Sequence, residues 1–344
     1  MNASDAPRPL RPGEEERLGA LFEAVYGPDW RARTCIERYL RRDGWPASVS
    51  VVESDGILVG AQPTYDVPCL VAGTETRLSV LVDVVTHPAY RRRGLFSAVL
   101  DHAAAECVAR GSAVALTTPN EDAHRGFAKK RDWSLLTVLE CRVRLLRPEA
   151  VLVQRYHFPR SIAAVLGSFL AMATGGRSRS GPGITEMDGT PPREELDVLW
   201  RRCAPSIRVA QQRDGLWFHW RFGRPGPKAR YHFLADRKGG TLAGYAVTTL
   251  RTMAGVPVTL LVDSFCPREP ESTRAELVNA VVSYTGPGDP WARTLARQAF
   301  WRIPSSLTGR PYRVYTRIPD RTASRHVLIE PEAWLMTPAD SDLA

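Results

Sequence analysis

A run of basic residues closed by a glycine, Arg91-Arg92-Arg93-Gly94, stands directly before a segment of helical spacing that begins at Leu95. A helix N-terminus presents unpaired N–H groups and the positive end of the helix dipole. A glycine there lets a ligand approach the backbone closely, and arginines beside it add charge-assisted hydrogen bonds. The pattern therefore favours a site for a diphosphate over its plainer interpretation, a solvated charge run at an ordinary turn.

Four titratable residues lie near this turn along the sequence, namely Asp83, His87, Glu121 and His124. A carboxylate or an imidazole at such a place can accept a proton from a reacting amine. Asp83 is expected on a strand two residues before Val85, which would put both side chains on one face of a sheet. The histidines are as well explained by ordinary hydrogen bonding as by catalysis.

A small set of elements must position these residues. Periodicity predicts helices at 15–26, 35–42, 95–110 and 123–131, and strands at 47–53, 57–67, 77–86, 113–118 and 135–146. Asp55-Gly56 between two alternating segments predicts a hairpin, and Pro88 ends the third strand. The order predicts a mixed α/β fold with helices on both faces of a central, mostly antiparallel sheet.

Two stretches resemble motifs of one family. Arg91-x-x-Gly94-x-Phe96 is similar to the acyl-CoA motif of the GNAT superfamily of N-acetyltransferases, although Phe96 replaces the usual small residue. The run from Pro119 to Trp133 resembles the downstream segment of that family, in which an asparagine ends a strand and a short helix leads to a Gly-Phe or Gly-Trp pair. Phe127 stands where the family often has the tyrosine that protonates the departing thiolate.

The resemblance implies direct attack of a bound amine on an acyl-CoA thioester, with the N–H of Val85 as the candidate oxyanion donor. It implies Asp83, Glu121 and His124 as candidates for proton transfer. The residues that it implies for binding acyl-CoA are Val84, Val85, Thr86, Arg91, Arg92, Arg93, Gly94, Leu95, Phe96, Ser97 and Asn120. Asn120 is equally explained as a helix cap.

The second half of the chain echoes the first. Gly240-Thr241-Leu242-Ala243-Gly244 repeats the pattern of residues 56–60, and Leu261-Val262-Asp263 repeats that of residues 81–83. After Asp263 the sequence lacks the glycine and the arginine triplet. We therefore expect an acyl-CoA domain at 1–148, a helical segment and linker at 149–195 and a degenerate GNAT-like domain at 196–344. The Gly, Pro and Ser content of Arg177–Pro192 predicts a loop.

Composition bounds the class of protein. The 344 residues are 44% hydrophobic and 24% charged, which suits a globular chain of two domains. The most apolar stretch, 162–174, is predicted to be a buried helix rather than one on a surface, so no membrane contact is expected. The start of the chain lacks the apolar core of a secretory signal, and the six cysteines lack metal-ligand spacing. We expect a cytoplasmic protein with reduced thiols and no metal.

The leading hypothesis is an N-acyltransferase that moves an acetyl or other short acyl group from acyl-CoA to a small-molecule amine. One alternative is transfer from aminoacyl-tRNA in natural-product or envelope biosynthesis, which the net charge of +9 would suit. The other is a CoA-binding module without catalysis. The sequence leaves the acceptor, the acyl chain length, the oligomeric state and the pathway open.

Overall fold

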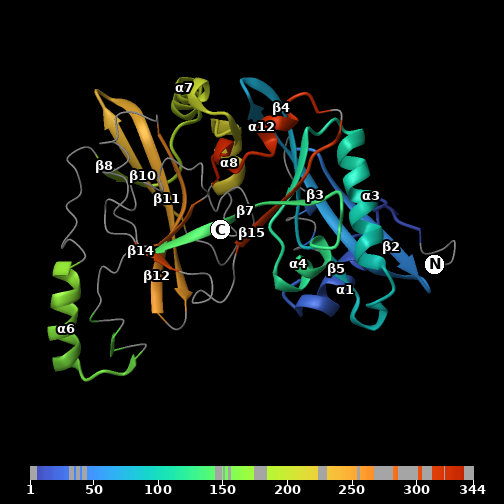
Figure 1. Ribbon diagram of the computed structural model, residues 1–344, viewed down its shortest axis with the longest axis horizontal. Coiled ribbons are helices and arrows are strands. Elements are labelled where there is room, and N and C mark those ends of the chain that lie inside the picture. The colour runs from blue at the N-terminus through green and yellow to red at the C-terminus, as the bar shows by residue number, and fades with distance from the viewer. Residues whose placement is uncertain are drawn as a thin grey trace. The chain divides into compact units, whose positions relative to one another are not determined.

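The computed structural model describes residues 6–30, 35, 39–40, 45–143, 149, 152–153, 156–173, 184–223, 231–253, 256–266, 282–285, 301–303, 312–320 and 322–336. The chain forms two compact units. The first comprises Met1–Thr137 and Tyr312–Glu330, and the second comprises Val138–Pro311 and Pro331–Ala344. The predicted mixed α/β class is confirmed in both, with a mixed sheet and flanking helices (Figure 1).

The described strands of the first unit form a sheet in the order β1-β2-β3-β4-β6-β15, with β5 also paired to β3. Its strands are β1 Arg8–Pro9, β2 Ala47–Ser54, β3 Ile57–Val71, β4 Thr74–Leu81, β5 Val85–Thr86, β6 Val114–Thr117 and β15 Tyr312–Arg317. Only β4 and β6 run parallel among these pairs. The helices are α1 Glu15–Tyr26, α3 Leu95–Ala109, α4 Glu121–Phe127, α12 Arg325–Leu328 and the short helix η3 Pro88–Tyr90.

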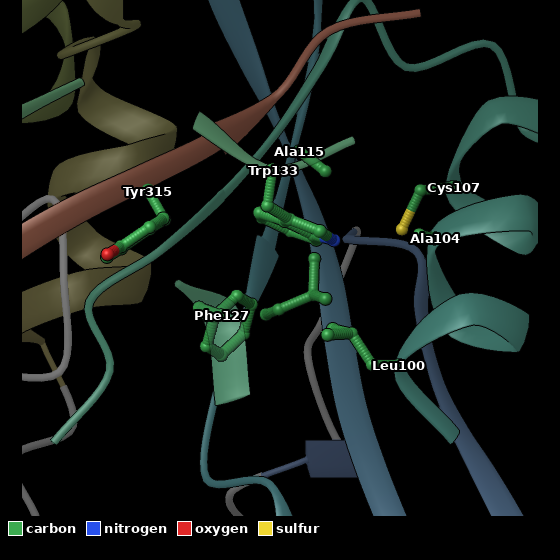
Figure 2. Close-up of a cluster of buried hydrophobic side chains, with 8 residues drawn as sticks. Leu100, Ala104, Cys107, Ala115, Phe127, Trp133 and Tyr315 are labelled. Carbon is green, nitrogen blue, oxygen red and sulfur yellow. The ribbon is translucent and has the colours of Figure 1, made fainter. Parts of the chain in front are cut away.

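Helix α3 packs on β2 and β3, while α1 packs on β3 and β5 (Figure 1). Gly60 on β3 permits the close approach of α3, because a Cβ atom there would lie 3.3 Å from Cγ1 of Val99. The core beneath α3 and α4 contains Leu100, Cys107, Phe127 and other apolar side chains (Figure 2). The core therefore fixes α3, which carries the basic turn, firmly on the sheet.

The second unit has a sheet in the order β7-β13-β12-β11-β10-β8, with β14 also paired to β7. Its strands are β7 Ser134–Val143, β8 Ile184–Met187, β9 Val209–Gln211, β10 Tyr231–Lys238, β11 Thr241–Met253, β12 Val256–Phe265, β13 Val282–Thr285 and β14 Trp301–Ile303. Its helices are α6 Arg160–Ala173, α7 Arg193–Cys203, α8 Gly215–Phe222, η4 Ala204–Ser206 and η5 Pro331–Ala333. No helix of the described residues is long and apolar enough to cross a bilayer.

Two strands, β7 and β15, pair with strands that are distant from them in the sequence. Residues Glu140–Val143 of β7 pair with β13 of the second unit. The strand beside β6 in the first unit is β15, where Tyr315 stands opposite Thr117. The expected boundaries at 148 and 196 followed sequence order and so assigned residues 312–330 to the second domain. The structure groups them with the first unit instead, because strand pairing does not depend on sequence order.

The structure also differs from three local predictions. Ile184–Met187, within the predicted loop, is strand β8 paired with β10. Residues 77–86 are not one strand, since β4 ends at Leu81 and β5 begins at Val85. Helix α6 is exposed rather than buried, and only Ala163 and Gly167 of its described side chains are covered. The predicted helix at 35–42 lies largely outside the described residues.

Candidate active site

The sheet of the first unit opens at one point, between β4 and β5. Thr64 on β3 pairs with Leu81, and Ala61 pairs with Val85, so three residues of the outer strand face two of β3. One extra residue in a strand is a β-bulge, which bends the chain away from its partner. The pairing of β4 with β6 ends at the same level, at Leu81 and Thr117. The bulge therefore leaves an opened strand next to the end of β6.

Pro63 of β3 supplies a reason why the sheet opens at this bulge. The carbonyl of Pro63 accepts a hydrogen bond from the N–H of Val82 at 3.2 Å, so this residue faces β4. Proline has no N–H to donate in return, and the ladder loses one bond. The buried side chain of Gln62 spans the gap, since its Nε2 donates to the carbonyls of Pro63 and Val82, each at 2.9 Å.

Asp83 occupies the centre of the bulge with φ +45°, in the left-handed region that non-glycine residues seldom adopt. The strand alternation expected for Asp83 and Val85 does not hold, because Asp83 is not in a strand. Its half-buried carboxylate accepts a hydrogen bond of 2.7 Å from the hydroxyl of Tyr39. A carboxylate is thus held at the opening of the sheet by a tyrosine that the sequence analysis did not single out.

The register of β5 determines which N–H groups face the opening. The N–H of His87 donates to the carbonyl of Val59 at 2.9 Å, and the bonds of an antiparallel ladder alternate along the strand. The N–H of Val85 therefore points to Ala61 on β3. By the same alternation, the N–H of Thr86 points away from β3, and Val84 lies in the opened stretch between Leu81 and Val85. The donor expected at Val85 is committed to the sheet, and Val84 takes its place as the candidate.

The basic turn has the geometry of an anion cradle. Gly94 is the N-cap of α3 with φ +82°, no side chain caps the helix, and a Cβ atom added to Gly94 would meet nothing within 4 Å. Arg91, Arg92 and Arg93 are exposed, and the guanidinium of Arg93 lies 4.8 Å from the ring centre of Tyr90. The first-turn N–H groups, those of Leu95 to Ser97 among them, have no intrahelical acceptors and border this open space.

Phe96 points into the apolar core, as its replacement of a small residue requires. Its ring packs edge-on against Phe127 with centroids 5.5 Å apart. A Cβ atom on Gly126 would lie only 2.4 Å from Cε1 of Phe96. The glycine of α4 therefore makes room for the phenylalanine of α3, and the side chain of Phe96 does not block the first turn of α3.

The strand β15 brings polar side chains to α4 from the far end of the sequence. The hydroxyl of Tyr315 lies 3.0 Å from Nδ1 of His124, and Nη1 of Arg313 lies 2.7 Å from the carboxylate of Glu121. Figure 2 shows Tyr315 beside Phe127, with its hydroxyl directed away from Leu100 and Cys107. No local signal in the sequence could place Tyr315 here, because it is 191 residues from His124.

Two of these groups have shifted pKa values. The hydrogen bond from Arg313 lowers the pKa of Glu121, which makes that carboxylate a weaker base. Burial raises the pKa of Tyr315, and the charge of Arg313 partly opposes the shift. Tyr315 is 4% exposed, so its phenol keeps its proton at neutral pH.

The remaining predicted residues have plainer roles. The side-chain oxygen of Asn120 accepts a hydrogen bond from the N–H of Ala123 at 2.9 Å, so it caps α4, and its NH2 group can still donate to a ligand. His87 accepts a hydrogen bond from the N–H of Ala89 and caps η3. Within the described residues, no three His, Cys, Asp or Glu side chains gather as a metal site would need.

The comparisons with known proteins agree with this geometry. A family model described as an acetyltransferase (GNAT) domain matches residues 6–136. A comparison of the sequence with curated proteins found no match.

Solved structures resemble the chain over most of its length. A probable N-acyltransferase from Enterococcus faecalis V583 is 12% identical with a TM-score of 0.62, over 92% of this chain and 72% of that one. A GCN5-related N-acetyltransferase from Anabaena variabilis is 10% identical with a TM-score of 0.61, over 91% of this chain and 72% of that one. N-myristoyltransferase from Saccharomyces cerevisiae with bound myristoyl-CoA is 11% identical with a TM-score of 0.60, over 92% of this chain and 83% of that one. Residues 6–136 of the chain thus match the GNAT acetyltransferase domain family, and the solved structures share the fold over most of the chain.

Proposed function

We propose that the chain transfers an acetyl or other short acyl group from acyl-CoA to the amine of a small molecule, within a ternary complex. The observation that carries the proposal is the start of α3 at Gly94, which no side chain caps and which is open to solvent. Exposed arginines precede it in the sequence, and the strand upstream of them is opened at Val82–Val84. A diphosphate and a thioester need these two features at one end of the same sheet.

The diphosphate of CoA is proposed to accept hydrogen bonds from the N–H groups of Leu95, Phe96 and Ser97, with Arg91 to Arg93 adding charge. The pantetheine arm would then follow Val84 to Thr86, whose outward N–H groups have no strand pairing with β6. The structural similarity to a myristoyltransferase with bound myristoyl-CoA supports an acyl-CoA in this fold. The residues proposed for this role are those expected from the sequence, except that Val85 contributes packing rather than its N–H.

The reaction follows from this placement. The amine nitrogen attacks the carbonyl carbon of the thioester, a C–N bond forms, and the negative charge on oxygen is stabilised by the N–H of Val84. The C–S bond then breaks, the sulfur takes a proton, and the ammonium of the product loses one to a base. Positioning of the two substrates supplies much of the rate enhancement.

Tyr315 is the proposed proton donor to the sulfur, with His124 beside it to restore the proton. Tyr315 lies across β6 from Leu81, the last residue of β4, since Thr117 pairs with both residues. Its raised pKa suits a group that must hold a proton until the C–S bond breaks. Tyr315 thus takes the role that the phenylalanine at position 127 cannot perform.

Asp83 is the proposed acceptor of the ammonium proton, directly or through water. Its carboxylate lies at the bulge itself. Glu121 is the weaker candidate, because Arg313 binds its carboxylate and lowers its pKa.

The second unit is proposed to be a degenerate copy of the first that does not bind CoA. Its aromatic helix α8 is part of the core, because Trp217, Phe218 and Phe222 are buried. We place the enzyme in the cytoplasm, which the buried thiols of Cys69, Cys107 and Cys203 support, since none of the three forms a disulfide.

Calorimetry with acetyl-CoA tests the proposal. The wild type should bind one equivalent, and Arg91→Glu/Arg93→Glu should weaken binding at least about tenfold through the lost phosphate contacts. The control is Arg11→Glu/Arg201→Glu, which changes the net charge equally at two exposed arginines outside the basic turn. An acetyl-CoA affinity that Arg91→Glu/Arg93→Glu leaves unchanged would contradict the proposed site.

Turnover separates the alternatives. An amine panel with detection of free CoA should show thiol release that depends on one acceptor class. Release that requires aminoacyl-tRNA and stops on RNase treatment would instead support the aminoacyl transferase. Tight CoA binding without turnover on any amine would support the module without catalysis.

A further inference from the structure

Helix α6, the green helix labelled in Figure 1, buries Ala163 and Gly167, while the large apolar side chains of its described part are exposed. Ala163 is 0% exposed, and Gly167 packs so tightly that an added Cβ atom would lie 2.7 Å from Cβ of Glu149. A helix that serves only the core of its own protein turns its large apolar side chains inward. The orientation of α6 is the reverse.

The exposed side chains form one continuous stripe. Ile162, Val165, Leu166 and Phe169 are 47%, 58%, 41% and 64% exposed. Their spacing of three, four and seven residues places them on one face of the helix. Contiguous apolar surface of this kind marks a contact with another molecule or with a membrane.

The sequence around the stripe indicates what it contacts. From residue 150 to 185 there is no aspartate or glutamate, while Arg155, Arg160, Arg177 and Arg179 add positive charge. Just before the helix, Tyr156 and Phe158 are 63% and 38% exposed. Arginines and aromatic side chains beside an apolar helical face are the features of helices that lie in the interface of an anionic bilayer.

We propose that α6 binds the surface of an anionic lipid bilayer, with its axis in the membrane plane and the stripe 162–169 inserted between the headgroups. At 14 residues the helix is about 21 Å long, shorter than the roughly 30 Å of a hydrocarbon core, so it lies on the membrane and does not cross it. The acyl transfer proposed above is not needed for this contact. Such a surface would hold the enzyme near amines that are themselves bound to the membrane.

Vesicle sedimentation of the full chain tests the proposal. The protein should pellet with phosphatidylcholine vesicles that contain about a third phosphatidylglycerol, and about tenfold less with phosphatidylcholine alone. Val165→Asp/Phe169→Asp should reduce binding to the anionic vesicles at least about tenfold. The matched control is Val198→Asp/Leu250→Asp, which adds the same charge at side chains 44% and 62% exposed elsewhere in the second unit.

The outcomes separate the possible occupants of the stripe. The proposal is supported if Val198→Asp/Leu250→Asp keeps vesicle binding and Val165→Asp/Phe169→Asp loses it. An unchanged affinity for acetyl-CoA would show that the first unit is still folded. No binding to either kind of vesicle would overturn it, as would equal binding by both variants. Sedimentation velocity that shows a dimer dissociated by Val165→Asp/Phe169→Asp, without vesicle binding, would assign the stripe to a second copy of the chain.

Discussion

The three-stranded meanders of the two units have the same register, residue for residue, yet only one of them opens. In the first unit Ala47 pairs with Tyr65 and Val52 with Gly60. In the second, 184 positions later, Tyr231 pairs with Thr249 and Asp236 with Gly244, and both hairpins shift register at the next residue. A parallel strand then follows in each, β6 beside β4 and β13 beside β12.

The bulge recurs at the same place in both meanders, but its state differs. In the second unit Val247 pairs with Asp263 and Thr248 with Leu261, so Val262 is the extra residue and β12 continues as a strand. In the first unit the equivalent of Val247 is Pro63, and the chain leaves the strand between Leu81 and Val85. The N–H that proline lacks distinguishes the closed bulge from the open one.

The aspartates of the two bulges show what the difference means. Asp263 is 0% exposed and accepts hydrogen bonds from Tyr245 at 2.8 Å and Arg213 at 3.3 Å. Asp83 is half-buried and accepts a hydrogen bond of 2.7 Å from the hydroxyl of Tyr39. One backbone irregularity thus holds a fully buried ion pair in the second unit, and in the first it holds the half-buried carboxylate for which we propose a chemical role. Strain of this kind persists where a site uses it.

The largest expected effect comes from removing the ion pair of the closed bulge. Asp263→Ala takes the carboxylate away from a guanidinium, that of Arg213, which is 0% exposed. Removing one partner of a buried pair costs about 3–5 kcal/mol. Chemical denaturation should show this loss, whereas Asp83→Ala should cost less than about 1.5 kcal/mol. Equal losses for the two aspartates would contradict the distinction between a closed and an open bulge.

Exchanging the residues that set the two states tests the role of proline. Val247→Pro removes an N–H from a central strand, which should destabilise the protein by about 3 kcal/mol. Pro63→Val returns the N–H to β3 and should leave stability unchanged or higher, while acyl transfer falls because the strand closes. Denaturation midpoints and turnover measured on both variants check this. An active Pro63→Val enzyme would show that the opening does not depend on the proline.

Asp83→Asn should affect activity far more than stability. The amide can still accept the hydrogen bond of Tyr39, but it cannot take up a proton, so kcat should fall about a hundredfold. Steady-state kinetics across pH should also show the loss of the acidic limb of the profile. A kcat within about twofold of the wild type would make Asp83 an architectural residue, as its counterpart Asp263 is.

A pH effect of smaller size should appear in the first unit alone. Hydrogen bonds from Arg8, together with the N–H of Arg11, lower the pKa of Glu14 to about 2. Because the folded pKa is below the unfolded one, this stabilisation is complete above about pH 5 and is lost as pH falls toward 2. The free energy of unfolding should be about 1–2 kcal/mol lower at pH 3 than at pH 6 because of this carboxylate. Glu14→Gln should abolish that part of the difference. An unchanged pH slope in the variant would contradict the assignment.

Local patterns predicted the elements of the first unit well. Asp55-Gly56 marked the hairpin, the apolar spacing gave α1 at its observed bounds, and Gly94 gave the start of α3. The echo of residues 56–60 at 240–244 corresponds to the shared register of the two hairpins. These features depend on residues within a few positions of one another.

The features that sequence reasoning missed depend on distant contacts. Neither the pairing of β15 with β6 nor the contact of Tyr315 with His124 has a local signal, because each joins segments about 190 residues apart along the chain. The outward face of α6 was missed because periodicity identifies an apolar stripe without saying what covers it. The bulge did have a signal, the proline at position 63 inside a central strand.

Hydrogen exchange with and without acetyl-CoA tests the central claim most directly. The ligand should slow amide exchange in peptides that contain Val84–Thr86 and Leu95–Ser97, and leave peptides of β12 unchanged. Protection confined to the second unit, or none at Leu95–Ser97 at saturating acetyl-CoA, would contradict the account.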